Sequence, residues 1–454
     1  MKTILEGARE IPVKGSYDVI VVGGGTAGAI AGIAAAREGA KTLILEANGF
    51  LGGTATASLV TPLMGNHVDG KPLNTGIGLE VMQKLKETGD CGELNGNLGY
   101  FNWDMLKFVL EDMYLDAGGE LMYHAHFSAP IMEGNALKGI IVESKSGRFA
   151  LLGKVIIDAS GDADVAARSG APIESGDETG KNQALSLRFS VANIDLDKFY
   201  QFLHSLDGYT TTPPFFHGAH VNGNRYALTP FFEKAYEEGV LEVSDGDYFQ
   251  FFGVPGRPNE LAFNCPRISE KTDATNVDHL TNAQIEGRAR IRRFMNFFKK
   301  YFPGFENAYI SSIASMVGIR ESRRVRGEYY LTEDDHVNAR KFPDGVAKNR
   351  YPIDVHSSKK GGGINFYSHL KPGDYHEIPY RCLVPLEVEN LLVAGRCIST
   401  SFLAQAAIRI EPNCHALGEA AGVAAAMAIR ENVTVRQLDG VKLRARLREN
   451  GANL

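Results

Sequence analysis

Short apolar runs and longer mixed stretches alternate along the first fifty residues of the chain. Residues 19–22 and 41–45 are apolar runs of the length and content of buried parallel strands. Between them, alanine and isoleucine occupy every face of a stretch from Thr26 to Ala36, which ends before Gly39, a residue suited to a left-handed helix cap. The pattern predicts a strand, a buried helix and a second strand, which together form a βαβ unit.

The middle of the chain changes to strand-like periodicity. Asn102 is placed to cap a helix, and strand-like runs follow at residues 121–127, 138–143 and 147–152, separated by "EGNA" and "SKSG" turns. The apolar positions of the helix recur at helical spacing and are Leu106, Val109, Leu110 and Met113. The three runs predict a β-meander.

Two further strands end in small-residue turns. Residues 155–157 precede "ASGD", and residues 391–394 precede Gly395 and Arg396. From 411 to 429 the chain is a helix rich in alanine and glycine, for which we expect close packing against the sheet. The residues that give this helix a smooth face are Gly418, Ala421, Gly422, Ala425 and Ala426.

The first turn has the spacing of a dinucleotide-binding motif. Gly23, Gly25 and Gly28 fill the GxGxxG positions for a tight bend, for close approach to a pyrophosphate and for helix packing. Glu46 ends the second strand, where a carboxylate accepts both hydroxyls of the adenosine ribose and repels a 2′-phosphate. A glycine-rich turn in an unrelated α/β protein is the alternative, but strand, turn, helix, strand and acid occur together, and this combination favours a dinucleotide.

Composition limits the class of protein. The chain has 454 residues, enough for two lobes, and its net charge of -6 argues against nucleic-acid binding. The five cysteines form no CxxC pair and are expected to be reduced thiols. The first residues lack the apolar core of a signal peptide, and no run of 18 apolar residues occurs. We therefore expect a soluble, cytoplasmic protein.

These segments, together with residues 318–335 and 377–396, resemble the bacterial FAD-dependent oxidoreductase family, which is glutathione-reductase-like and distantly related to the fumarate reductase and succinate dehydrogenase flavoproteins. The resemblance implies an α/β fold: a Rossmann-like FAD-binding domain with a parallel sheet and a β-meander crossover, plus an inserted α+β substrate or cap domain. It implies that residues 1–180 and 381–454 build the FAD-binding domain and that residues 181–380 form the cap. No cysteine quartets for iron–sulfur clusters occur.

The resemblance also implies which residues contact FAD. The turn after residues 391–394 would meet the pyrophosphate and ribityl chain, and the N-terminus of the helix at 411 would face N1 and the C2 carbonyl of the flavin. The residues carried over are Gly23, Gly25, Thr26, Ala27, Gly28, Glu46, Ala47, Gly53, Thr54, Ala55, Phe127, Ala159, Gly161, Asp162, Gly395, Arg396, Ala407 and Ile408.

Candidate catalytic residues are His356, Arg320 and Arg409. His356 lies in a predicted glycine-containing loop and would move a proton, or else simply make hydrogen bonds within the protein. Arg320 and Arg409 would clamp a carboxylate or a sugar hydroxyl. The alternative is a structural ion pair for each, or a flavin contact for Arg409.

Three other features of the sequence, an arginine cluster, a basic and aromatic segment and Cys414, are expected to be structural rather than functional. The arginines at 320, 323, 324 and 326 are expected to form mostly a structural network with Glu321, Glu328, Glu333 and Asp334. The segment 286–302 is either a membrane-surface helix or, as we favour, a surface helix packing its apolar side inward. Cys414 is expected to be a core thiol rather than a redox partner of the flavin.

Two functions are compatible with the sequence. The first is an FAD oxidoreductase that transfers a hydride between FAD and a small organic substrate, at a hydroxyl or amine carbon or an activated carbon–carbon bond. The second is an FAD-containing scaffold that acts in RNA binding or modification.

The glycine clusters at Thr75 and Lys359 lack the context of a second nucleotide site, so we expect no stable NAD(P)H site. Oxygen, a quinone-like compound or a protein would then exchange electrons with the flavin.

Overall fold

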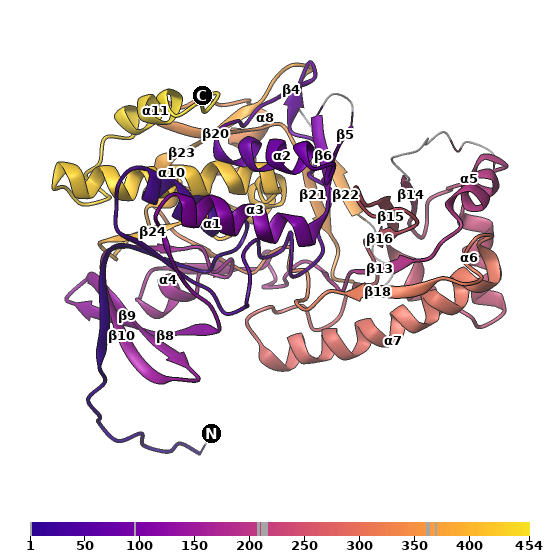
Figure 1. The fold of residues 1–454 in the computed structure, drawn as a ribbon, viewed down its shortest axis with the longest axis horizontal. Coiled ribbons are helices and arrows are strands. Elements are labelled where there is room, and N and C mark those ends of the chain that lie inside the picture. The colour runs from indigo at the N-terminus through magenta and orange to yellow at the C-terminus, as the bar shows by residue number, and fades with distance from the viewer. Residues whose placement is uncertain (1, 95–96, 207–208, 210–216, 360–363, 368–369) are drawn as a thin grey trace.

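The computed structural model describes residues 2–94, 97–206, 209, 217–359, 364–367 and 370–454. Two sheets organise this part of the chain (Figure 1). The larger, seven-stranded sheet has the order β7-β2-β1-β10-β9-β8, with β24 paired to β10 off this path. Its strands are β1 Val13–Val22, β2 Thr42–Leu45, β7 Glu120–Met122, β8 Ala125–Glu133, β9 Ala136–Ser144, β10 Gly147–Asp158 and β24 Leu391–Val393.

The core of this sheet is parallel, and this confirms the predicted fold class. β1 pairs in parallel with β2 and β10, and β10 also pairs in parallel with β24. Helix α1, Thr26–Arg37, connects β1 to β2. Strands β8, β9 and β10 form the antiparallel meander. Because β24 joins β10, the C-terminal part of the chain completes a sheet begun at the N-terminus.

Two strand predictions need correction. Residues 121–127 were expected to be one strand, but they divide into β7 and β8 because His124 adopts a φ of +54°, which turns the chain. Residues 147–152 and 155–157 were expected to be two strands, but they are one strand, β10. Its first half pairs with β9 and its second half with β24. The same strand therefore serves the meander and the parallel sheet.

The second sheet has five strands in the order β14-β15-β16-β13-β18 and its own aromatic core. Helix α7, Val277–Tyr301, runs along this lobe (Figure 1). The side chains of Ile291, Phe294, Phe297 and Phe298 on it are buried there. This confirms that the helix packs its apolar side inward. The strands are β13 Phe189–Ala192, β14 His217–His220, β15 Phe249–Gly253, β16 Leu261–Phe263 and β18 Tyr309–Ile313.

The remaining elements are short pairs of strands and the covering helices. The pairs are β3 His67–Val68 with β4 Lys71–Pro72, β5 Cys91–Leu94 with β6 Asn97–Phe101, β11 Ile173–Ser175 with β19 Arg323–Val325, β12 Leu185–Ser186 with β17 Arg267–Ile268, β20 Gly345–Asn349 with β23 His376–Pro379, and β21 Ile353–His356 with β22 Ile364–Tyr367. The helices are α2 Ile77–Glu87, α3 Trp103–Asp116, α4 Asp164–Arg168, α5 Leu196–His204, α6 Thr229–Glu237, α7 Val277–Tyr301, α8 Glu333–Val337, α9 Phe402–Ile408, α10 Glu411–Glu431, α11 Gly440–Glu449 and the 3₁₀ turns Val243–Asp247 and Tyr380–Leu383. Asn102 caps α3 as predicted.

Buried side chains form two main clusters. The first surrounds the seven-stranded sheet and also includes buried residues between Val325 and Ile398, while the second contains buried residues between Leu187 and Ala314. The division into residues 1–180, 181–380 and 381–454 stays a prediction. None of the helices in the described ranges is both long and apolar enough to cross a membrane.

Helix α10 packs against α1 rather than mainly against the sheet, which corrects the expected role of its small residues. A Cβ atom on Gly418 would lie 2.1 Å from the carbonyl oxygen of Ala27, and one on Gly422 would lie 2.2 Å from that of Ala31. The two helices lie side by side in Figure 1. Only glycine permits this approach of the two backbones.

We expect Gly418→Ala and Gly422→Ala each to lower the free energy of unfolding by about 1–3 kcal/mol, because the added methyl meets a backbone oxygen. At an unobstructed helix position, glycine to alanine would instead stabilise by up to about 1 kcal/mol. Urea unfolding of the purified variants measures whether the free energy of unfolding falls or rises. Ala416→Ser, on a partly exposed position of the same helix, is the control. Stabilisation by either glycine substitution would contradict the close packing.

Candidate functional site

A first cavity of about 270 Å³ lies where β1, β2, β10 and β24 end, beside the start of α1. Val22 ends β1, Leu45 ends β2, Ala159 follows β10 and Ala394 follows β24, and all four line it. The carboxyl ends of parallel strands meet at one edge of a sheet, which is the usual ligand edge of an open α/β sheet.

The glycine turn shapes the floor of this cavity. Gly23 has a φ of +94°, and a Cβ atom there would lie 2.7 Å from the carbonyl oxygen of Ala159. A Cβ atom on Gly28 would lie 1.8 Å from the carbonyl oxygen of Gly23. Gly25 starts α1 with no side-chain cap. The first turn of α1 therefore approaches the cavity with its backbone N–H groups available to an anion.

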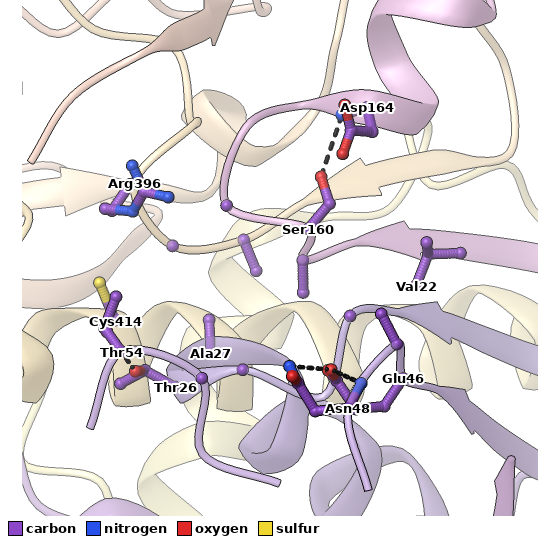
Figure 2. A pocket seen from close by; sticks show the side chains of 18 of the residues that line it. Val22, Thr26, Ala27, Glu46, Asn48, Thr54, Ser160, Asp164, Arg396 and Cys414 are labelled. Atoms are coloured by element: carbon purple, nitrogen blue, oxygen red, sulfur yellow. Dashed lines mark hydrogen bonds between the residues drawn. The ribbon is translucent and has the colours of Figure 1, made fainter. Parts of the chain in front are cut away.

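Glu46 and Asn48 lie at one end of the cavity (Figure 2). Glu46 Oε2 accepts a hydrogen bond from the Gly24 N–H at 2.7 Å, and Oε1 accepts from the Asn48 N–H at 2.7 Å and from Asn48 Nδ2 at 2.8 Å. These bonds fix the buried carboxylate at the edge of the cavity. A carboxylate held in this way can accept further bonds from ribose hydroxyls.

Arg396 and Cys414 lie at the other end (Figure 2). Arg396 Nη2 donates to Asp162 Oδ1 at 3.1 Å, and Arg396 Nη1 has no hydrogen-bond partner among the described residues. Burial raises the pKa of the Cys414 thiol to about 12. A thiol that stays protonated is a poor nucleophile, so Cys414 packs as an apolar residue.

Thirteen of the eighteen residues expected to contact FAD line this cavity, and the contacts themselves stay predictions. They are Gly23, Gly25, Thr26, Ala27, Glu46, Ala47, Gly53, Thr54, Phe127, Ala159, Gly161, Gly395 and Arg396. The other five lie behind the wall: Gly28 packs on Gly23, Asp162 bonds to Arg396, and Ala55, Ala407 and Ile408 are buried. Ala407 and Ile408 belong to α9, a helix that the sequence pattern did not indicate.

A second cavity of about 650 Å³ adjoins the first. Thr54, Arg396, Arg409 and Glu411 line both, so the two cavities meet at the end far from Glu46. The five-stranded sheet supplies part of the opposite wall through Ala219, Gln250 and Phe252. The second cavity therefore lies between the two lobes.

The three candidate catalytic residues all line the second cavity. His356 belongs to strand β21 rather than to a loop, which corrects the prediction, and the glycines expected to close over a ligand lie outside the described residues. Its Nε2 lies 3.2 Å from Asp354 Oδ1, and Arg409 Nη2 lies 3.3 Å from Asp354 Oδ2. Asp354 thus connects the histidine to the arginine.

Burial and the neighbouring charges determine the ionisation of Asp354 and His356. Burial opposes the charge of Asp354, but His356, Arg409 and Arg320 outweigh it and lower the pKa of Asp354 below its ordinary value. Burial, followed by the positive charge of Arg320, lowers the pKa of His356 to about 3. At neutral pH the aspartate is ionised and the histidine is neutral.

Two further arginines face the cavity without a carboxylate partner. Arg320 Nη1 donates to the Ala184 carbonyl at 2.7 Å, and Arg188 Nη1 donates to the Leu59 carbonyl at 3.2 Å. Within the described ranges, neither forms an ion pair. Burial, and then repulsion by Arg409, lowers the pKa of Arg320 to about 9, and burial lowers the pKa of Arg188 to about 10. Both remain cationic at neutral pH, so the cavity is electropositive.

The neighbouring arginines form the structural network that the sequence predicted, although most of the predicted partners are wrong. Arg323 pairs with Asp164, Arg324 with Glu321, and Arg326 Nη1 with Glu174 Oε1 at 3.0 Å. Of the expected acids, only Glu321 takes part; Glu328 pairs with Arg436 instead. Arg320 is separate from this network.

The polar residues of the second cavity that sequence reasoning missed include Arg188, Tyr248, Asp354 and Glu411. Asp354 could have been found, because residues two apart on a strand share a face and His356 was already a candidate. Glu411 carries the ordinary signal of an acid in the first turn of a helix. Arg188 and Tyr248 come from the second lobe, where no motif marks them.

A family model described as FAD dependent oxidoreductase matches residues 18–447. The chain belongs to this family. It is therefore an FAD-dependent oxidoreductase, and its cofactor is FAD. When bound, FAD supplies two-electron redox chemistry at its flavin ring. The chain fits the cofactor through the glycine cradle at Gly23 and Gly28, the fixed carboxylate of Glu46 and the unpartnered Nη1 of Arg396.

Curated relatives match over short segments. Glutathione reductase of Schizosaccharomyces pombe is 34% identical over 98 residues, which is 21% of this chain and 19% of that protein. The tRNA uridine 5-carboxymethylaminomethyl modification enzyme MnmG of Alkaliphilus metalliredigens is 32% identical over 157 residues, 30% of this chain and 23% of that protein. The matches thus span about a fifth of the length of these relatives.

Solved structures resemble the chain over most of its length but at low identity. A geranylgeranyl bacteriochlorophyll reductase-like protein from Thermoplasma acidophilum is 14% identical, with 96% of this chain and 84% of that chain covered and a TM-score of 0.47. The flavin-dependent brominase Bmp2 is 13% identical, with 96% and 83% covered and a TM-score of 0.45.

Glu46→Ala should weaken FAD retention by about 1.5–3 kcal/mol, the range of a charge-assisted hydrogen bond. This corresponds to roughly 10- to 150-fold in Kd. Recovery of flavin fluorescence on dilution of the holoprotein measures the release. Glu46→Gln, which keeps one oxygen acceptor, should lose less. Unchanged retention in Glu46→Ala would place the ribose contact elsewhere.

Proposed function

We propose that the protein transfers a hydride between FAD and a small organic substrate held in the second cavity. The observation that carries this proposal is the meeting of the two cavities at Thr54, Arg396, Arg409 and Glu411. A cofactor whose adenosine lies at Glu46 would have its flavin at this junction. A substrate carbon in the second cavity would then face the flavin.

The charges of the second cavity favour a substrate that carries an anionic group such as a carboxylate. Arg188 and Arg320 are buried cations whose side chains donate to backbone carbonyls, and buried cations are normally paired. A carboxylate between the lobes would supply the missing partner and form charge-assisted hydrogen bonds. The reacting position would be a hydroxyl or amine carbon, or an activated carbon–carbon bond.

His356 and Arg409 would orient the substrate at the reacting end. Asp354 fixes Arg409 on one side and the Nε2 atom of His356 on the other. The neutral imidazole has its Nδ1 without a partner among the described residues. Because Nε2 donates to the Asp354 carboxylate, Nδ1 can accept a hydrogen bond from a substrate hydroxyl or amine.

The alternative function is an FAD-containing protein that acts in RNA binding or modification. The similarity to the tRNA-modification enzyme favours it, but that similarity covers 30% of this chain. The net charge of -6 favours the small-molecule function.

We also propose that the protein acts in the cytoplasm, because its five cysteines are all free and buried.

Anaerobic mixing with a panel of hydroxy acids, amino acids, unsaturated acids and uncharged sugars tests the proposed function. For the oxidised holoenzyme, a hydroxy or amino acid should bleach the flavin absorbance; for the dithionite-reduced holoenzyme, an unsaturated acid should restore it. Arg320→Ala should raise KM for the active acid by about 10-fold or more, since a hydrogen bond to a charged group contributes about 1.5–3 kcal/mol. Arg326→Ala, in the structural network, is the matched control. Reaction with the sugars alone would refute the anionic substrate.

NADH and NADPH should reduce the flavin slowly or not at all. The glycines near Thr75 begin α2, and a Cβ atom on Gly78 would lie 2.6 Å from the side chain of His415, so this turn is filled by packing. The cluster at Lys359 falls partly outside the described residues. Anaerobic stopped-flow mixing decides the point. Rapid, saturable reduction at micromolar nucleotide would contradict the expectation and remove the need for oxygen, a quinone-like compound or a protein as electron partner.

A further inference from the structure

Glu411 occupies a position that the hydride-transfer scheme leaves without a role. It is the first residue of α10 and lines both cavities at their junction. The residue is 7% exposed, and neither Oε1 nor Oε2 has a hydrogen-bond partner within the described ranges of the chain. A buried carboxyl without a partner is costly, and such groups concentrate at sites where a ligand completes the bonding.

The surroundings of Glu411 do not hold it as a structural carboxylate. An acid in the first turn of a helix is normally stabilised by the free N–H groups, but neither carboxyl oxygen of Glu411 accepts a hydrogen bond from the described part of α10. Burial raises the pKa of Glu411 to about 8, and the positive charge of Arg188 opposes this rise only in part. At neutral pH the carboxyl is mostly protonated and can give up a proton.

We propose that Glu411 exchanges the proton that accompanies hydride transfer, giving it to the substrate in reduction and taking it in oxidation. This inference rests on the proposed function. In oxidation, the substrate C–H bond breaks and its hydrogen leaves with two electrons to the flavin. The substrate O–H or N–H bond breaks as well, its proton passes to the Glu411 carboxylate, and a C=O or C=N bond forms. The substrate is oxidised and FAD is reduced.

The other groups around the junction do not suit this role. The charged groups from the elements packed there are Arg188, Arg320, Arg396, Arg409 and Asp354. The arginines remain cationic and Asp354 remains ionised. Burial lowers the pKa of His356 to about 3 and raises the pKa of Tyr248 and of Cys414 to about 12. Glu411 is the group of this set whose pKa lies nearest the pH at which cells work.

A pH titration of the flavin absorbance in the holoenzyme, without substrate, tests the position of Glu411. We expect a spectral step near pH 8 in the native protein, because a carboxylate that forms beside the flavin perturbs its absorption. Glu411→Gln should abolish the step. Glu419→Gln is the matched control: Glu419 is a buried acid on the same helix with a pKa raised to about 7 by burial, but it lines neither cavity. The step should persist in that variant.

The pH profile of flavin reduction by the active substrate tests the proton transfer itself. In the native protein the rate should rise with pH through about 8, because the carboxylate is the accepting form. Glu411→Gln should lower the rate by about 100-fold or more and flatten the profile. Glu411→Asp should restore part of the rate together with the pH dependence, and it replaces the glutamine variant if that variant loses FAD.

The outcomes separate the two proposals. A missing spectral step, or a step that survives in Glu411→Gln, overturns the placement of Glu411 whatever the substrate panel gives. A step that disappears with an unchanged rate profile overturns its role in proton transfer. A panel in which no compound changes the flavin absorbance counts against the proposed function, and the proton-exchange proposal falls with it.

Discussion

The site depends on how closely helix α1 approaches its neighbours. Gly28 places α1 against the turn at Gly23, and Gly418 and Gly422 place α10 against α1. In each contact the space for a side chain is already occupied by a backbone carbonyl oxygen. The start of α1 is therefore fixed between β1 and α10, and its free N–H groups keep their direction toward the first cavity. The position of α1 therefore depends on the absence of a Cβ atom at Gly28, Gly418 and Gly422.

The same packing places the start of α10 at the junction of the two cavities. Helix α9 ends just before it at Ile408, and Arg409 and Ile410 connect the two helices. The contact between α1 and α10 thus helps to fix the side chains of Arg409 and Glu411 as well as the glycine turn of the first cavity. The second lobe contributes Arg188 and Tyr248 from across the cavity. A relative shift of the lobes would change the distance between these two side chains and the carboxyl of Glu411.

Local signals in the sequence were sufficient to predict the parallel sheet. The βαβ unit, β24 and α10 have continuous apolar or small-residue patterns, and their bounds were predicted within two residues, except that β1 begins at Val13 rather than at Val19. The strand β10 was divided in error at Gly153 and Lys154; Gly153 lies inside the strand, where a Cβ atom would meet Ile20 and Ile156. The break at His124 was missed because its positive φ falls on a residue other than glycine or asparagine. The grouping of His356, Arg320 and Arg409 around Asp354 joins separate elements, and no local pattern contains it.

The charges of the second cavity connect substrate binding to the ionisation of Glu411. Arg188 favours the ionised form of this carboxyl, while burial opposes it more strongly. An anion bound between Arg188 and Arg320 would offset those positive charges and remove part of what favours ionisation. The pKa of Glu411 would then rise when the substrate binds, which favours the protonated form that gives its proton in the direction of reduction. By linkage the effect is reciprocal: a neutral Glu411 adds no negative charge near the bound anion, and the anion binds more tightly. Anion binding at Arg188 and Arg320 and protonation of Glu411 therefore favour each other.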